Sequence, residues 1–293
     1  MTAVFIGSTK GIGLATIKAF AKQIAHPKAI IVGRNRTQFA PEIDGLRALN
    51  SNGEYIFIEH EIALIKDIDD VCDLIKQQVN QIKFLIVSQG YIGFGGRENN
   101  ADGLDDSMSL RYYGRIRFTQ NLLPIMAPGA TAVSVLAGGM EGYIFEDDLD
   151  LERNYTIPNT MGHFASLHTL AYDKLAEQHP DKGFVHYSPG FVSTGLLGRS
   201  AQSAPWWLKF LISWVLEPLC DVFSTSPEES GERVLYHATN ELYGSGSWPL
   251  HWKGEKVEGK ALVEYRERRF QDRVEGHNFR MFERAVEGGK ASG

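Results

Sequence analysis

Residues 6–13 of the chain read IGSTKGIG, and this stretch decides the fold. It overlaps the end of an apolar run, AVFIG at 3–7, that has the composition of a buried strand. A pattern of helical period, from Ile12 to Gln23, follows directly. The glycines let the backbone come close to a diphosphate, and the start of the helix offers unpaired N–H groups. The stretch therefore predicts a phosphate-binding turn between the first strand and the first helix of an α/β fold.

Short apolar runs continue to alternate with helical patterns along the chain. Runs rich in Val and Ile, separated by helices, are typical of a parallel sheet buried on both faces. We expect helices near 68–81, at 104–126 and at 158–174. The prediction is one α/β domain built on a doubly wound (Rossmann) parallel sheet of about seven strands. The further expected strands are AIIVG at 29–33, EYIFIEH at 54–60, KFLIVSQG at 83–90, ATAVSVLAGG at 130–139 and FVHYSPG at 184–190.

The composition argues against several classes of protein. A net charge of −6 disfavours sequence-independent nucleic-acid binding, which needs a basic face. The two cysteines lack metal-ligand spacing, so we expect no metal site and a reducing, cytoplasmic compartment. Lys209, Glu217 and Pro218 interrupt the apolar segment 204–223, so no integral membrane span is expected. The first strand begins almost at Met1, which leaves no room for a signal peptide.

The end of the second strand indicates which dinucleotide the turn would bind. A cofactor with a free ribose 2′-hydroxyl favours an acidic residue there. The sequence has GRNR at 33–36 instead, and Lys10 stands in the phosphate turn. Arg34, Arg36 and Lys10 would suit a 2′-phosphate, so NADP is expected rather than NAD. For Arg36 an ordinary surface charge is the alternative.

Several motifs together resemble the short-chain dehydrogenase/reductase family. SQG at 88–90, LRYYG at 110–114, VSVLAGG at 133–139 and SPGFVST at 188–194 match its motifs in order and spacing, over roughly residues 1–245. The resemblance implies hydride transfer between a nicotinamide and a carbonyl or alcohol. Some phrases also resemble a fungal branch tied to natural-product pathways. The cofactor-binding residues so expected are Gly7, Ser8, Thr9, Lys10, Gly11, Ile12, Gly13, Arg34, Arg36, Glu61, Ser88, Gln89, Gly90, Pro189, Gly190, Val192 and Thr194.

The family's acid–base residues are missing from their expected positions. Arg111 stands at the asparagine site, and the serine site falls on Ala137 or a neighbouring glycine. The tyrosine and lysine sites fall on His163 and Leu167 in one alignment. Counting back from Pro189 places them on Thr160 and Phe164 instead. None of the 11 tyrosines has a lysine four residues later.

Four residues are candidates for the missing chemistry. His163 can donate or accept a proton near neutral pH, although a structural histidine is an equal alternative. Arg111 can hold an oxyanion or a carboxylate, but a salt bridge with Asp105 or Asp106 is the alternative. Tyr113 and Tyr143 could place hydroxyls near the nicotinamide, although packing is the simpler role for both.

The segment from Pro205 to Trp214 is rich in aromatic residues and is predicted to belong to a substrate lid at about 195–226. Such a lid would suit a bulky apolar substrate, with core or oligomer packing as the alternative. The domain is expected to cover 1–250. The charged extension 251–293 is expected to be a solvated helix with a fraying tail.

Three functional hypotheses follow. The first is an NADP-dependent oxidoreductase with atypical catalytic residues, acting on a bulky apolar carbonyl or alcohol in secondary metabolism. The second is an isomerase or cyclase on the same scaffold that keeps NADP as a structural ligand. The third is a catalytically inactive nucleotide-binding protein. By analogy with the family, a homodimer or homotetramer is expected to form through the two long helices.

Overall fold

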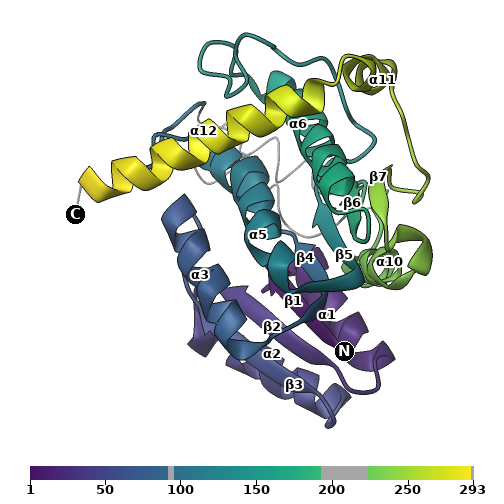
Figure 1. Ribbon diagram of the computed structural model, residues 1–293. Helices are drawn as coiled ribbons and strands as arrows, with labels where there is room; N and C mark the ends of the chain where they lie inside the picture. The colour runs from purple at the N-terminus through teal and green to yellow at the C-terminus, as the bar shows by residue number, and fades with distance from the viewer. Residues whose placement is uncertain (92–95, 193–223, 292–293) are drawn as a thin grey trace, which may run out of the picture.

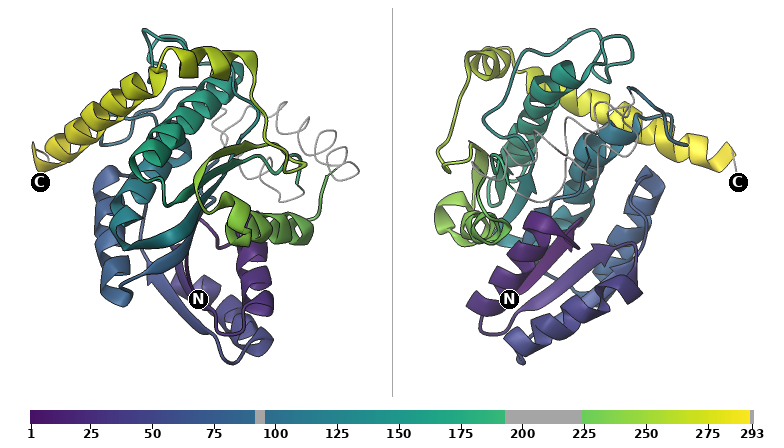
Figure 2. Two further views of the ribbon diagram at one scale, coloured as in Figure 1. Left: turned by 45° about the vertical axis from the view of Figure 1, so that its right-hand side comes forward. Right: turned by 180° about the vertical axis from the view of Figure 1, so that it is seen from behind.

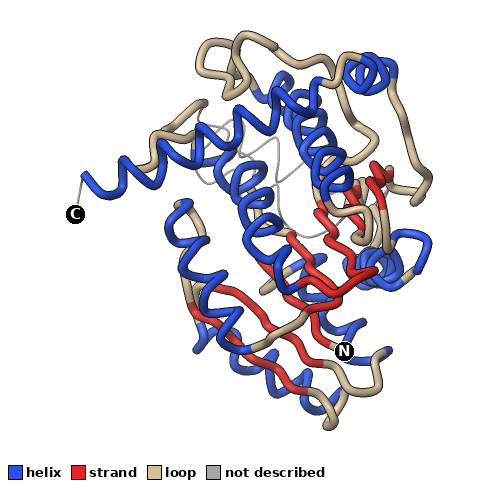
Figure 3. Tube along the Cα trace, in the orientation of Figure 1, coloured by secondary structure: helices blue, strands red, loops and turns tan. Residues whose placement is uncertain are grey.

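The computed structural model describes residues 1–91, 96–192 and 224–291. A seven-stranded sheet of order β3-β2-β1-β4-β5-β6-β7 forms its centre, and every neighbouring pair of strands is parallel. Figure 3 shows these strands as one layer between helices. The predicted fold class is confirmed. The strands are β1 (Thr2–Ile6), β2 (Lys28–Gly33), β3 (Glu54–Glu59), β4 (Ile82–Val87), β5 (Met126–Val135), β6 (Gly183–Tyr187) and β7 (Gly246–Leu250).

Helices cover both faces of the sheet (Figures 1 and 2). Alternate residues of β1 point to opposite faces, so Val4 joins one core cluster and Phe5 the other. The Phe5 side is closed by α1 (Gly11–Gln23), α2 (Arg36–Leu49) and α10 (Pro227–Thr239). The Val4 side is closed by α3 (Ile65–Gln78), α5 (Gly114–Leu122) and α6 (Ile157–Gln178). Burial on both faces explains why the strands are continuously apolar.

The expected helix at 104–126 is interrupted in the structure. It starts after Asp105, whose carboxylate accepts a hydrogen bond from the backbone N–H of Met108 at 2.9 Å. It ends at Pro124, which has no N–H to extend the helical ladder. A π-helical turn separates its first and main parts. The parts are α4 (Asp106–Met108), the π-helical η1 (Ser109–Tyr113), α5 and the 3₁₀-helical η2 (Leu123–Ile125), and β5 then begins at Met126 instead of residue 130.

The C-terminal extension is part of the fold. After η5 (Glu241–Tyr243) and β7, it forms α11 (Lys260–Glu267) and α12 (Phe270–Ala291). Figure 1 shows α12 lying across the outside of α6 and α3. One face of α12 is apolar and buried, through Val274, Met281, Phe282 and Ala285. The prediction of a solvated helix is therefore wrong for this face, because the many charges of the segment lie on the other side.

Candidate active site

The predicted phosphate turn lies at the carboxyl ends of β1 and β4. Gly7 and Gly11 have φ values of 70° and 57°, which favour glycine. A Cβ at Gly7 would lie 2.4 Å from the backbone nitrogen of Gln89. A Cβ at Gly13 would lie 2.6 Å from the Ser88 hydroxyl oxygen. The turn thus packs directly on the segment after β4, and only glycine fits at these places.

The start of α1 is open to an anion. Lys10 is its N-cap residue, and no side chain caps the first N–H groups. Ser8 and Ser88 share a hydrogen bond of 3.0 Å between their hydroxyls, which joins the two segments. Gln89 is 6% exposed, yet neither the oxygen nor the nitrogen of its side-chain amide has a hydrogen-bond partner within the described residues. Uncapped helical N–H groups and an unpartnered amide fit a bound diphosphate.

The three cations expected to bind a 2′-phosphate, Lys10, Arg34 and Arg36, differ in their contacts with the rest of the protein. Lys10 and Arg34 are exposed and make no ion pair with any described residue. The guanidinium of Arg36 instead donates to the Phe57 carbonyl at 2.6 Å and lies over the Phe57 ring. Arg36 therefore supports β3, and Lys10 and Arg34 remain available to a phosphate. Glu61, also predicted to bind cofactor, is exposed in the loop after β3.

The Pro-Gly turn after β6 lies at the same edge of the sheet. The backbone N–H of Ser188 donates to the Leu250 carbonyl at 2.9 Å, which continues the pairing with β7. Gly190 has a φ of 71°, and a Cβ there would lie 3.0 Å from Cβ of Trp252. Val192 pairs with Thr225 through a β-bridge. Thr194 and nearly all of the predicted lid, 195–223, lie outside the described residues.

Arg111 lies against the carboxyl end of β4. A Cβ at Gly90 would be 3.1 Å from its Cγ, and its guanidinium lies 5.9 Å from the centre of the Phe164 ring. The alternative role, a salt bridge with Asp105 or Asp106, does not form, because Asp105 caps α4 instead. Burial lowers the pKa of Arg111, and Tyr155 and Asp105 oppose that shift. Arg111 is thus a largely buried cation with no ion pair among the described residues.

A second cation, Arg115, lies one turn further along the helix and is fully buried. Its Nη1 donates to the Val87 carbonyl at 3.0 Å and to the Val135 carbonyl at 2.9 Å. The same nitrogen donates to the Ser134 hydroxyl at 2.8 Å. Burial and the nearby Arg111 lower the pKa of Arg115 to about 9, so it stays charged at neutral pH. Arg115 ties β4 to β5 below Arg111, although its helical position alone indicates an exposed charge.

His163 is not free to transfer protons. The backbone N–H of Phe145 donates to its Nδ1 at 3.2 Å, so its own proton sits on Nε2. That nitrogen lies 2.9 Å from the Leu149 carbonyl and donates to it. Burial lowers the pKa of His163, which favours this neutral form. These contacts favour the alternative of a structural histidine, because the ring holds the loop before α6.

The two tyrosine candidates lie in different surroundings. Tyr113 is fully buried, and its hydroxyl shares a 2.8 Å hydrogen bond with Nε2 of His277 on α12. Burial and this hydrogen bond favour a packing role for Tyr113, and its catalytic role stays a prediction. Tyr143 is 61% exposed, and its ring centre lies 6.5 Å from that of Tyr265 on α11. A catalytic role for Tyr143 stays a prediction.

Neither alignment of α6 places an acid beside Arg111. Leu167 is buried in the apolar core, and Phe164 packs under the Arg111 guanidinium. The Thr160 hydroxyl donates back to the Ile157 carbonyl at 2.7 Å. The phenol of Tyr155, just before α6, interacts electrostatically with Arg111, and sequence patterns alone do not single it out.

Tyr155 is partly buried at the mouth of the same region. Burial and the Asp105 carboxylate raise the pKa of its phenol, while Arg111 and the Ser107 hydroxyl act in the opposite direction. The phenol therefore keeps its proton at neutral pH. It lies close enough to Arg111 for the charge of each to shift the pKa of the other.

A buried polar chain fixes the segment after β5. Nε2 of His186 accepts from the Ala137 N–H at 3.2 Å, so its Nδ1 donates to the Thr169 hydroxyl at 2.8 Å. That hydroxyl donates to Glu141 at 2.6 Å. Burial raises the pKa of Glu141. These hydrogen bonds anchor the segment after β5 to α6 and β6, and none of them extends to a residue of the predicted cofactor site.

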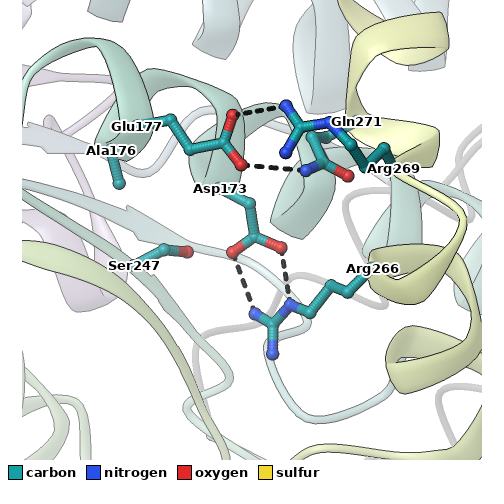
Figure 4. Close-up of a pocket in the computed structure, with 7 residues that line it drawn as sticks. All are labelled: Asp173, Ala176, Glu177, Ser247, Arg266, Arg269 and Gln271. Atoms are coloured by element: carbon teal, nitrogen blue, oxygen red, sulfur yellow. Dashed lines mark hydrogen bonds and ion pairs between the residues drawn. The ribbon is translucent and has the colours of Figure 1, made fainter.

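Figure 4 shows a groove at the other end of α6. Arg266 makes two hydrogen bonds to Asp173, at 2.8 and 2.9 Å, and Glu177 accepts from Arg269 and Gln271. Ser247, near the amino end of β7, forms another wall. The charges satisfy one another, and the groove is not at the carboxyl edge, so we assign it no ligand.

No cluster of metal-binding side chains occurs in the described ranges. None of the helices within those ranges is both long and apolar enough to cross a membrane.

Comparisons with known proteins agree with the geometry at this edge. A family model described as short chain dehydrogenase matches residues 1–142. The chain is 33% identical to oxidoreductase AN1596 of Emericella nidulans, over 98% of this chain and 94% of that protein. It is 36% identical to oxidoreductase lepF of Aspergillus flavus, over 82% of this chain and 74% of that protein. The chain belongs to the short-chain dehydrogenase family.

Solved structures support the same fold. A 3-oxoacyl-[acyl-carrier protein] reductase from Brucella melitensis in complex with NAD superposes with a TM-score of 0.59 at 18% identity, covering 89% of this chain and 97% of that one. A short chain dehydrogenase from Burkholderia cenocepacia in complex with NADP gives 0.58 at 16% identity, covering 84% and 94%. The protein is thus an oxidoreductase of this family, of the type that uses a nicotinamide cofactor and a small-molecule substrate.

Proposed function

We propose that the protein is an NADP-dependent oxidoreductase that acts on a bulky apolar carbonyl or alcohol, with a rebuilt acid–base site. The observation that carries this proposal is that the glycine-rich turn and Arg111 lie at the same edge of the sheet, where Arg111 is a cation without an ion pair among the described residues. The uncapped start of α1 would hold the diphosphate, and Lys10 and Arg34 the 2′-phosphate. The cofactor, when bound, would supply or accept the hydride.

Exposed apolar side chains around the same edge support an apolar substrate. Met140 follows β5, and its sulfur lies 3.8 Å from the Ser188 hydroxyl. Phe191 follows the Pro-Gly turn, and Trp252 packs against Gly190. Clustered exposed apolar groups commonly mark a binding surface. The exposed fractions are 46% for Met140, 42% for Met161, 73% for Phe191 and 49% for Trp252.

Arg111 and Tyr155 would divide the roles of the family's acid–base set. Arg111 would hold the substrate oxygen as negative charge develops on it. Tyr155 would give that oxygen its proton, because its phenol stays protonated and interacts electrostatically with Arg111. In the oxidative direction the same groups would accept the proton and hold the alkoxide.

The setting follows from the relatives and from the motifs. The related oxidoreductases come from Emericella and Aspergillus, and the natural-product resemblance of the motifs supports a role in fungal secondary metabolism. A cytoplasmic location and a lid at 195–226 on a domain covering 1–250 remain part of the proposal.

Replacement of Tyr155 by phenylalanine should lower kcat about 100-fold, because the proton would have to come from water. Steady-state oxidation of NADPH, with a panel of bulky apolar ketones as substrates, measures this. The matched control is Tyr143→Phe, which removes an exposed hydroxyl and should leave kcat within twofold. If Tyr143→Phe loses activity and Tyr155→Phe does not, the proton donor is misassigned.

Cofactor preference tests the role of Lys10 and Arg34. The wild type should prefer NADPH to NADH, and Arg34→Ala should reduce that preference about 10-fold, the value of one charge-assisted contact. Arg36→Ala is the matched control, because the Arg36 guanidinium already binds the Phe57 carbonyl. Equal use of NADH and NADPH by the wild type would contradict the assignment. Tight NADPH binding without consumption on any substrate would favour the isomerase or cyclase instead.

A further inference from the structure

The turn that carries Arg111 is irregular and needs support from outside. Residues Ser109–Tyr113 form a π-helical turn, in which the N–H of Gly114 bonds to the Ser109 carbonyl. A π turn holds one residue more than an α turn, and a residue turns the helix by about 100°. Closing the turn to α geometry would therefore swing Arg111 away from Gly90. The direction of the guanidinium depends on keeping this turn.

The residues next to Arg111 are anchored to the far end of the chain. The Tyr112 hydroxyl donates to Oδ1 of Asn278 at 2.8 Å. The Tyr113 hydroxyl shares a 2.8 Å hydrogen bond with Nε2 of His277. Asn278 and His277 are neighbours on α12, 166 and 164 residues away in sequence. Both contacts are buried, so a lost partner would not be replaced by solvent.

The opposite side of the turn has its own attachment. The Ser109 hydroxyl donates to the Ala63 carbonyl at 2.7 Å, in the loop before α3. A Cβ at Gly114 would lie 2.8 Å from the Ser109 carbonyl oxygen, so glycine is needed where the turn meets α5. The turn is thus held at one end by Ala63 and along its middle by α12. The side chains that directly follow Arg111, Tyr112 and Tyr113, each form a hydrogen bond to α12.

We propose that Asn278 and His277 are positioning residues, through which α12 sets the direction of Arg111 by way of Tyr112 and Tyr113. The C-terminal helix is then a working part of the active site, although it lies on the outer side of α6. The functional side of this proposal rests on the proposed role of Arg111. The mechanical side, that α12 maintains the π turn, does not.

Hydrogen–deuterium exchange tests the mechanical side. Asn278→Leu removes the acceptor at similar volume and should raise exchange at the amides of 110–114 about 10-fold in rate, because the turn opens more often. Tyr112→Phe should do the same. The control is Phe279→Ala on the same helix, at a side chain that is 61% exposed, and it should leave these amides unchanged. Unchanged exchange in both Asn278→Leu and Tyr112→Phe would overturn the inference.

A double-mutant cycle tests whether the anchor acts through Arg111. Asn278→Leu should lower kcat about 10-fold in the wild-type background and have no further effect on kcat in the Arg111→Leu background. The effects of two substitutions are not additive when one residue acts through the other. An equal loss in both backgrounds would mean general destabilisation and would overturn the positioning role. If exchange rises as expected but the wild type oxidises no NADPH, the proposed function fails while the mechanical anchor stands.

Discussion

Replacing Arg111 with leucine is expected to lower kcat about 1,000-fold, while the dissociation constant for NADPH changes by only a few fold. Leucine fills much of the same space against Gly90 and Phe164 but carries no charge. The loss should be large because the guanidinium is buried, and charge interactions are stronger where water is excluded. Arg115 cannot take over, since its donors are held by carbonyls of β4 and β5.

Arg111→Lys separates charge from shape. A lysine keeps the charge but lacks the planar fork of donors. The kcat of Arg111→Lys should therefore be about 10-fold higher than that of Arg111→Leu. Stopped-flow measurement of NADPH oxidation under single-turnover conditions separates the hydride step from cofactor binding. Thermal unfolding of each variant gives the control for folding. If Arg111→Leu folds normally and keeps turnover within threefold of the wild type, Arg111 takes no part in the chemistry.

The second large effect is a loss of stability in mild acid. Five histidines are buried, and burial lowers the pKa of each: His186 to about 3, His237 and His277 to about 4, His168 well below its usual range, and His163 below it. An unfolded histidine has a pKa of about 6.5. Between pH 6.5 and 4 the unfolded chain therefore binds protons that the folded chain does not. Stability is complete above pH 6.5 and falls as the pH is lowered.

The size of the acid effect follows from the pKa differences. One pKa unit is about 1.4 kcal/mol, so at pH 5 each of these histidines would cost at most about 2 kcal/mol. Burial raises the pKa of Glu141 and Asp102, so protonation of these two carboxyls favours the folded state in acid. This opposes the effect of the histidines but involves fewer groups. The free energy of unfolding should fall by several kcal/mol between pH 7.5 and pH 5.

Urea unfolding at pH 7.5, 6.5 and 5 measures this slope. His168→Leu should flatten it, because neither ring nitrogen of His168 has a partner among the described residues. His26→Leu, at an exposed position, is the control and should leave the slope unchanged. A free energy of unfolding that does not change between pH 7.5 and 5 would rule out the assignment of five neutral buried histidines.

Local patterns predicted the fold and the tight glycine turn after β1. The strands are buried on both faces, so their continuous apolar runs are visible without knowledge of their neighbours. The phosphate turn depends on Gly7 and Gly11, whose backbone freedom belongs to the residues themselves. The order of these elements along the chain, together with the rule of parallel connections, leaves few possible sheets.

The acid–base site could not be predicted in the same way. His163 resembles a free proton donor until the loop at 145–149 supplies partners to both ring nitrogens. Arg115 resembles a surface charge until the ends of β4 and β5 enclose it. Tyr155 stands outside any helical or strand pattern, and only folding brings it to Arg111. These properties come from contacts between segments far apart in the chain.

The C-terminal helix α12 has some properties that the sequence predicts and others that depend on tertiary structure. Its charges follow from the sequence, which predicts a helix in contact with water. Whether its apolar stripe is buried depends on α3 and α6 covering the same face of the sheet, and their placement is a property of the folded sheet. The amino-acid sequence thus determined the sheet and the phosphate turn, because periodicity and glycine act locally. Tertiary structure alone decided which polar groups are free to act, because that depends on the partners that packing supplies.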